Sequence, residues 1–129
     1  MKVLGILILM FLGYNNVGFT QNQETDLMIY DVTEEAAHFP EGNDFLQKWI
    51  AKNFELPSDL TKSEQGKIYL SFVIEKDGSL SNIRIIRGLS EKINNAAIEV
   101  VQKMPKWKPA INNGKPVRSR FMLPISVVL

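Results

Sequence analysis

The sequence predicts an α+β fold in which a three-stranded antiparallel sheet carries two helices on one face. Two patterns lead to this prediction. Apolar residues recur at helical spacing in two segments, and apolar and polar residues alternate in three. Along the chain these segments follow in the order helix, hairpin, helix and terminal strand. The chain has 129 residues, of which 45% are hydrophobic, and this suits a single globular domain with one core.

The first twenty residues have the layout of a secretory signal peptide. Lys2 precedes an apolar run over residues 3–12, and a more polar stretch ending in small residues follows. The run is too short to span a membrane, which needs about 20 apolar residues. We therefore expect export to the periplasm and cleavage near Thr20, with an uncleaved anchor or a buried N-terminal element as the alternative. The acidic residues 21–38 are expected to form a flexible lead-in with one short strand near 27–30.

The first helix is expected over residues 44–53. Asn43 is a suitable N-cap for it, and Pro57 prevents its continuation. A second helix should begin after Ser90, another suitable N-cap, and end before Pro105. Its apolar residues form one stripe with small residues in the centre, so we expect it to cover the hairpin closely.

A β-hairpin over residues 66–87 is the strongest local signal. Its two alternating runs flank Asp77-Gly78, and Asp-Gly favours a tight two-residue turn. A register that pairs Lys76 with Ser79 brings apolar residues opposite one another. The expected pairs are Phe72 with Ile83, Leu70 with Ile85, and Tyr69 with Ile86.

The last strand is expected over residues 117–129, where the alternation returns. It contains Pro124, and a proline cannot donate a hydrogen bond to a neighbouring strand. We therefore expect this strand at an edge of the sheet, or with its proline nitrogen facing away from the neighbour.

Composition argues against several classes of function. The absence of cysteine excludes thiol catalysis, disulfides and thiolate metal sites, and a net charge of +1 gives no field that suggests nucleic acid. His38 is the only histidine, and no nucleophile elbow, paired-carboxylate motif or metal-ligand spacing accompanies it. We expect no enzymatic activity, no metal or other cofactor and no small-molecule substrate.

Several motifs in the right order resemble the C-terminal domain of TonB. The matching segments are FPEG at 39–42, GKIYLSFVIEKDG at 66–78, MPKWKP at 104–109, NGKPV at 113–117 and LPI at 123–125. The similarity covers about residues 37–129. It departs from the family at Leu56, where tyrosine is usual, and at Ala110, where glycine is usual. A complete TonB also has a membrane anchor and a proline-rich arm, and the 129 residues contain neither, so the resemblance implies the binding head only.

The resemblance implies recognition of a short extended segment by β-strand addition to the last strand. The expected partner is the TonB box of a TonB-dependent outer-membrane receptor, or another periplasmic protein. The expected contact residues on this strand are Val117, Arg118, Ser119, Arg120, Phe121, Met122, Leu123, Ile125 and Val127. Three further residues are candidates for contact with the partner: Asn53, Trp107 and Lys115.

Purely structural roles, without partner binding, also explain most of these side chains. The basic residues of the last strand either steer an acidic segment or merely protect an exposed edge from aggregation. Trp107 either contacts a partner or closes the core under a rigid turn, and Asn53 suits a helix end without any function. A second hypothesis is a structural or assembly module that forms a homodimer through the same edge and has no role in transport.

Overall fold

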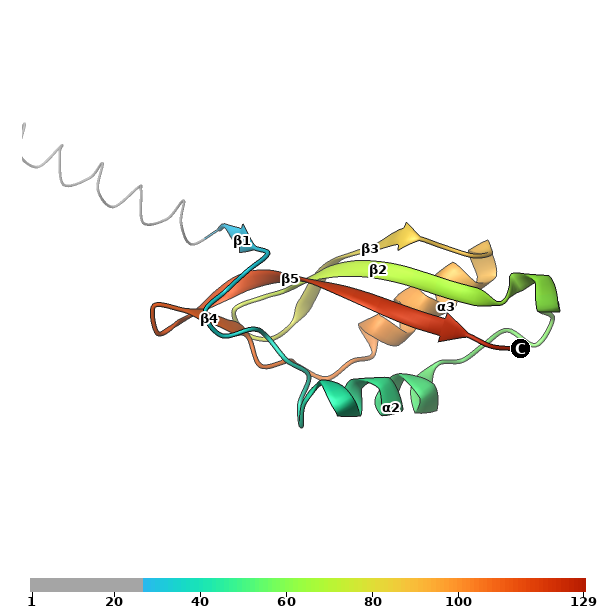
Figure 1. Cartoon of the computed structure of the whole chain (residues 1–129), viewed down its shortest axis with the longest axis horizontal. Coiled ribbons are helices and arrows are strands. Elements are labelled where there is room, and N and C mark those ends of the chain that lie inside the picture. Colours follow the sequence, from blue (N-terminus) through green and yellow to red (C-terminus); the bar gives the residue numbers. More distant parts are fainter. Residues whose placement is uncertain (1–26) are drawn as a thin grey trace, which may run out of the picture.

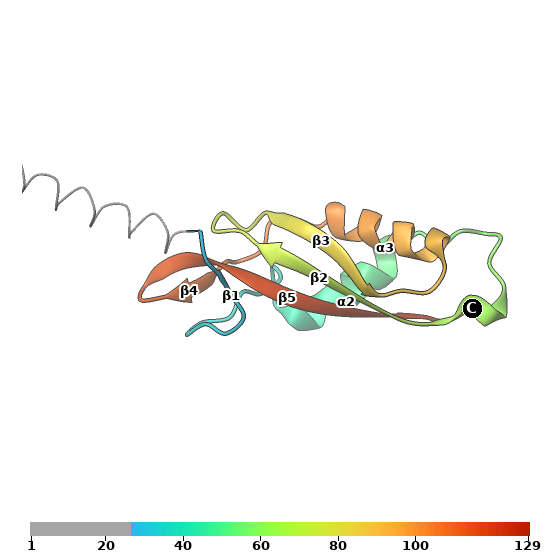
Figure 2. The same cartoon turned by 90° about the horizontal axis from the view of Figure 1, so that it is seen from above.

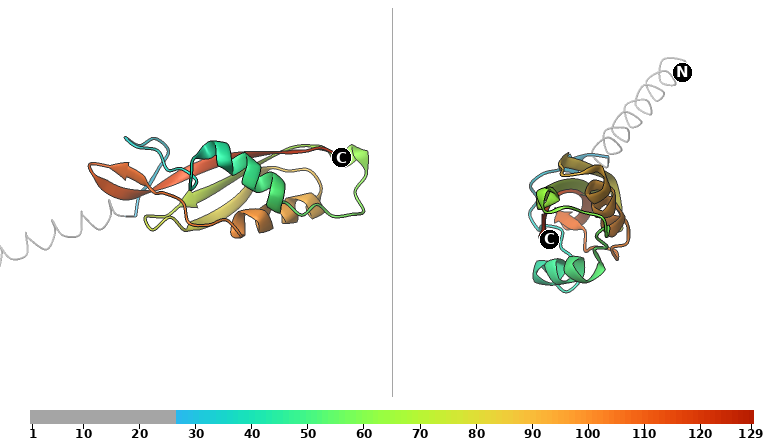
Figure 3. Two further views of the ribbon diagram at one scale, coloured as in Figure 1. Left: turned by 90° about the horizontal axis from the view of Figure 1, so that it is seen from below. Right: turned by 90° about the vertical axis from the view of Figure 1, so that its right-hand side faces the viewer.

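The computed structural model describes residues 27–129 and confirms the predicted α+β class. The predicted signal peptide, residues 1–20, lies outside the described residues. Both helices lie on the same face of the sheet (Figure 1, Figure 3). The elements in chain order are β1 (Ile29–Tyr30), α2 (Asn43–Asn53), the 3-10 turn η1 (Lys62–Glu64), β2 (Gly66–Ile74), β3 (Leu80–Arg87), α3 (Glu91–Gln102), β4 (Ala110–Asn112) and β5 (Lys115–Val127).

The sheet contains five strands rather than the predicted three. Its order is β1-β5-β2-β3, and β4 pairs with β5 in addition. The three predicted strands are the long antiparallel ones, whereas β1 pairs with β5 in parallel, so the sheet is mixed. The additional strand β4 is only three residues long, which is too short for an alternating pattern to reveal it.

The helices form the predicted core with the sheet. Ser90 caps α3 as expected, because its Oγ accepts a hydrogen bond from the Ile93 amide at 3.3 Å. At α2 the cap is Gly42, with φ 100°, and the Asn43 side chain instead accepts a hydrogen bond from the Phe39 amide. The buried helix residues are Leu46 and Ile50 of α2 and Ile93, Ala96, Ala97, Val100 and Val101 of α3.

The turn between β2 and β3 has three residues, not two. The Glu75 amide donates to the carbonyl of Ser79 at 2.8 Å, and the Gly78 amide donates to the carbonyl of Glu75 at 2.9 Å. Gly78 has φ 88°, so this is the three-residue loop that ends on a left-handed glycine. The predicted pairing of Lys76 with Ser79 is therefore wrong.

A bulge then partly restores the predicted register. Asn82 has φ 47°, and the pairing shifts by one residue between Ser71 and Val73. Leu70 consequently lies opposite Ile85, as predicted. The predicted pair of Phe72 with Ile83 falls at the shift itself, where no regular pair forms.

A second shift beside Leu70 changes the end of the hairpin. Tyr69 lies opposite Arg87, so its predicted pairing with Ile86 is wrong. The irregularities cannot be read from the apolar pattern, because that pattern fixes which face a residue occupies and not where an extra residue is inserted.

The described part of the acidic lead-in pairs with the domain through backbone bridges. Glu35 forms an antiparallel bridge with Ile111, and His38 forms one with Lys108. Ala37 between them is buried in the core. The backbone of the lead-in thus pairs with the segment around β4, and composition alone does not reveal such pairing.

Candidate functional site

The long strand β5 lies between β2 and β1. It pairs with β2 along residues 119–127 and with β4 along residues 115–117. Only Arg118 and Ser119 pair with β1. Figure 2 shows β1 beside the first part of β5, whereas the rest of β5 continues toward the C-terminus beyond it.

An open edge therefore exists along residues 120–127, on the side of β5 opposite β2. Apart from the β2 ladder, no backbone of residues 27–129 forms a hydrogen bond with this stretch. The expectation of an open edge over 117–127 is wrong for Val117, Arg118 and Ser119, which pair with β4 or β1. For Arg118 and Ser119 the cause is the short strand β1, whose pairing partner lies about ninety residues away in the chain. For Val117 the cause is β4, which forms a hairpin with the start of β5.

Side chains alternate along the open part of β5. Leu123, Ile125 and Val127 are buried under the helices, and Phe121 packs against the same core. Their side chains were expected to contact a partner, but in this structure they face the core. Arg120, Met122, Pro124 and Ser126 are exposed on the other face of the sheet, and Met122 is 50% exposed.

Arg118 is fixed by two elements at once. Its Nε lies 2.7 Å from Oε1 of Glu75 and its Nη2 lies 3.1 Å from Oε2, while Nη1 donates to the carbonyl of Leu27 at 2.8 Å. The hydrogen bonds from this guanidinium hold the pKa of the Glu75 carboxyl below its ordinary value, and Ser81 lowers it further. The same contact raises the pKa of Arg118. Its charge is already matched, so it is poorly suited to steering an acidic segment.

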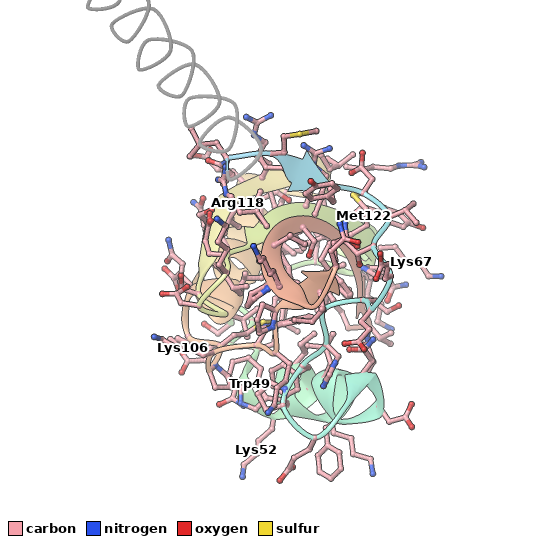
Figure 4. All side chains as sticks on the ribbon, turned by 90° about the vertical axis from the view of Figure 1, so that its left-hand side faces the viewer. Trp49, Lys52, Lys67, Lys106, Arg118 and Met122 are labelled. Carbon is pink, nitrogen blue, oxygen red and sulfur yellow. The ribbon has the colours of Figure 1, made fainter. Side chains whose placement is uncertain are left out.

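Arg120 contacts the residue that follows β1. Its Nη1 lies 3.0 Å from Oδ1 of Asp31, and both side chains are largely exposed. Figure 4 shows Arg118 and Met122 on the side of the molecule that carries β1, away from Trp49 and Lys52 of α2. The contacts of Asp31 and Leu27 with the two arginines were not predicted, although the short strand expected near 27–30 is present as β1.

Trp107 belongs to the core and not to the open edge. It is 3% exposed and forms edge contacts with Phe39, Phe72 and Phe121, at centroid distances of 5.6, 5.5 and 4.8 Å. Its amide also donates to the carbonyl of Gly78 at 2.9 Å, which ties it to the hairpin turn. A partner could reach this ring only if the core opened, so the suggested partner contact at Trp107 is not supported.

The structure does not bring the other two candidates together. The Asn53 side chain donates to the carbonyl of Trp49 at 2.8 Å, which is a helix-end contact. Lys115 is exposed where β4 turns into β5. The β4–β5 turn lies at one end of the molecule, whereas α2 lies below its middle (Figure 1).

Within residues 27–129 no three side chains of His, Cys, Asp or Glu gather as metal ligands. In the same range, no helix is both long and apolar enough to span a membrane. The arrangement that is present, a bare strand edge, can add another strand through backbone hydrogen bonds.

Comparisons with known proteins agree with this fold. The sequence profile of the family described as Gram-negative bacterial TonB protein C-terminal matches residues 60–129. Among solved structures, the chain is similar to the solution structure of the Helicobacter pylori TonB C-terminal domain, residues 179–285. The sequences are 24% identical, the TM-score is 0.50, and the match covers 68% of this chain and 83% of that one. No curated protein matches the sequence.

Proposed function

Because the chain belongs to the TonB C-terminal family of Gram-negative bacteria, we propose that it binds an extended segment of an outer-membrane receptor by β-strand addition. The added strand lies along residues 120–127 of β5. Residues 1–20 direct export, and the protein acts in the periplasm as a binding module of TonB-dependent transport. Its role is recognition of another protein, without catalysis and without a cofactor.

The observation that carries the proposal is the open edge of β5. Antiparallel neighbours alternate between residues whose backbone groups face the partner strand and residues whose groups face away. Pro124 lies opposite Tyr69 within the ladder, and its missing N–H suits a position that faces away from β2. By the same alternation, the amides of Arg120, Met122 and Ser126 face outward and are available to a partner.

The exposed side chains beside these amides suit an extended peptide. Met122 offers a flexible apolar surface. Arg120 offers a charge that, within residues 27–129, pairs with the exposed Asp31. Backbone hydrogen bonds provide the affinity of such a complex, and these side chains provide its selectivity.

The test is a titration of the protein, recovered from the periplasm after export, with synthetic peptides from the N-terminal segments of its host's TonB-dependent receptors. We expect backbone amide NMR shifts along residues 120–127. Met122→Pro removes an outward amide and should abolish binding, whereas Met122→Ala keeps the amide and should retain most of it. A urea unfolding curve shows whether each variant is folded. If Met122→Pro does not fold, Ser126→Pro serves as a second variant that removes an outward amide.

Two outcomes contradict the proposal. Equal binding by the proline and alanine variants would show that the peptide does not use the outward amides. A concentration-dependent dimer by size-exclusion chromatography, with no affinity for any receptor peptide, would instead favour the self-associating module, in which two copies pair through the same edge.

A further inference from the structure

β1 occupies the beginning of the edge that the proposed function assigns to a partner. Ile29 and Tyr30 pair in parallel with Arg118 and Ser119, directly before the open residues 120–127. The chain therefore already adds a strand of its own to this edge. A partner strand longer than the open stretch would meet β1 at Ser119.

Among residues 27–129, the side-chain contacts at the two ends of β1 are polar. At one end, Nη1 of Arg118 donates to the carbonyl of Leu27 at 2.8 Å. At the other end, Asp31 contacts Arg120, with the two side chains 71% and 45% exposed. Ion pairs exposed to this degree are weakened by solvent and salt.

β1 also buries little apolar surface. Leu27, Met28 and Val32, which flank the strand, are 71%, 53% and 85% exposed, and the two strand residues are only half-buried. The adjacent part of the sheet differs, because Leu70 and Phe72 of β2 are fully buried. A two-residue strand with so few buried contacts opens at a low cost in free energy compared with the core strands.

We propose that β1 is an internal competitor for the binding edge, and that it leaves β5 when a partner strand extends its pairing back to Arg118. This inference rests on the proposed function of the edge. While β1 is bound, only part of the edge is available. The apparent affinity for the partner is therefore lower when β1 is released in a smaller fraction of the molecules. Release also separates Asp31 from Arg120, so that the positive charge of Arg120 becomes available to the partner.

A disulfide between β1 and β5 tests the competition. The chain has no cysteine, so Tyr30→Cys with Ser119→Cys gives a single engineered pair between two residues that lie opposite each other. We expect the oxidised form to bind a receptor peptide about tenfold more weakly than the reduced form of the same variant. A control disulfide, Ser71→Cys with Arg84→Cys, joins β2 to β3 and should leave binding unchanged on oxidation.

A second variant shifts the competition the other way. Asp31→Asn removes the ion pair with Arg120 and should strengthen peptide binding by about 1.5- to 5-fold, the range expected for an exposed pair. Glu99→Gln removes one negative charge from the exposed side of α3 and should change nothing.

Native-state hydrogen exchange gives a readout that needs no peptide. We expect the Tyr30 amide to exchange much faster than the Leu70 amide in the free protein, and faster still in Asp31→Asn. Equally slow exchange at both amides would overturn the proposal. Equal peptide affinity of the oxidised and reduced forms of the variant with Tyr30→Cys and Ser119→Cys would also overturn it while leaving the proposed function intact. Failure of every form to bind a peptide would reject the proposed function, and the competitor role with it.

Discussion

The guanidinium of Arg118 on β5 forms a two-point contact with the carboxylate of Glu75 at the end of β2, at 2.7 and 3.1 Å. The two residues are 43 positions apart in the sequence, and their side chains are 21% and 25% exposed. Ser81 of β3 donates to the same carboxylate. One acidic group thus connects all three long strands beside the place where β1 joins the sheet.

This contact should tolerate a change of geometry poorly. Lysine has a single charged nitrogen and cannot reproduce the two-point contact, so Arg118→Lys should lower the free energy of unfolding by about 1 kcal/mol. Urea denaturation measures the difference. Arg84→Lys is the matched control on the exposed face of β3, and it should change stability by less than about 0.5 kcal/mol. Equal effects of the two variants would contradict the structural role of the contact.

The stability of the domain should depend on pH through Glu75. Because the folded state lowers the pKa of this carboxyl below its ordinary value of 4.5, its contribution is present above pH 4.5 and is lost as the pH falls through the folded pKa. The wild type should therefore be more stable than Glu75→Gln near neutral pH, and this difference should shrink in acid. Urea midpoints at a series of pH values test this, and a difference that is independent of pH would contradict it.

Gly78 should resist replacement at the hairpin turn. A Cβ atom there would lie 2.1 Å from the Trp107 carbonyl oxygen, and the residue has φ 88°. Gly78→Ala should cost more than about 3 kcal/mol, because it adds a backbone clash to the penalty of a left-handed residue. Gly114→Ala, also at positive φ but with nothing within 4 Å of its Cβ, should cost only about 1 kcal/mol. Thermal unfolding distinguishes the two, and equal losses would contradict the predicted clash.

Trp107 should be a main contributor to the core. Trp107→Ala removes a ring that contacts three other aromatic side chains and should cost about 3–5 kcal/mol. Phe45 of α2 is 47% exposed, so Phe45→Ala should cost less than about 1 kcal/mol. Denaturant unfolding followed by circular dichroism measures both. Similar losses would show that Trp107 is not packed as described.

The sequence by itself determined the class of fold and the positions of the main elements. Both helices, the hairpin and the last strand follow from the spacing of apolar residues, and Ser90 was identified as a cap from its place before such a pattern. These features are local, because a helix or strand that buries one face must repeat its apolar residues with a fixed period. The burial of Leu70 and of the apolar residues along one side of α3 could be predicted for this reason.

Only the tertiary structure decided how much of β5 is open. The three-residue turn, the bulge at Asn82 and the burial of Trp107 depend on which segments meet, and so do the pairing of β1 with Ser119 and the contact of Arg118 with Glu75. Such contacts join residues far apart in the chain and leave no periodic pattern in it. The sequence therefore located the strand that is proposed to bind, and long-range pairing determined which of its residues a partner can reach.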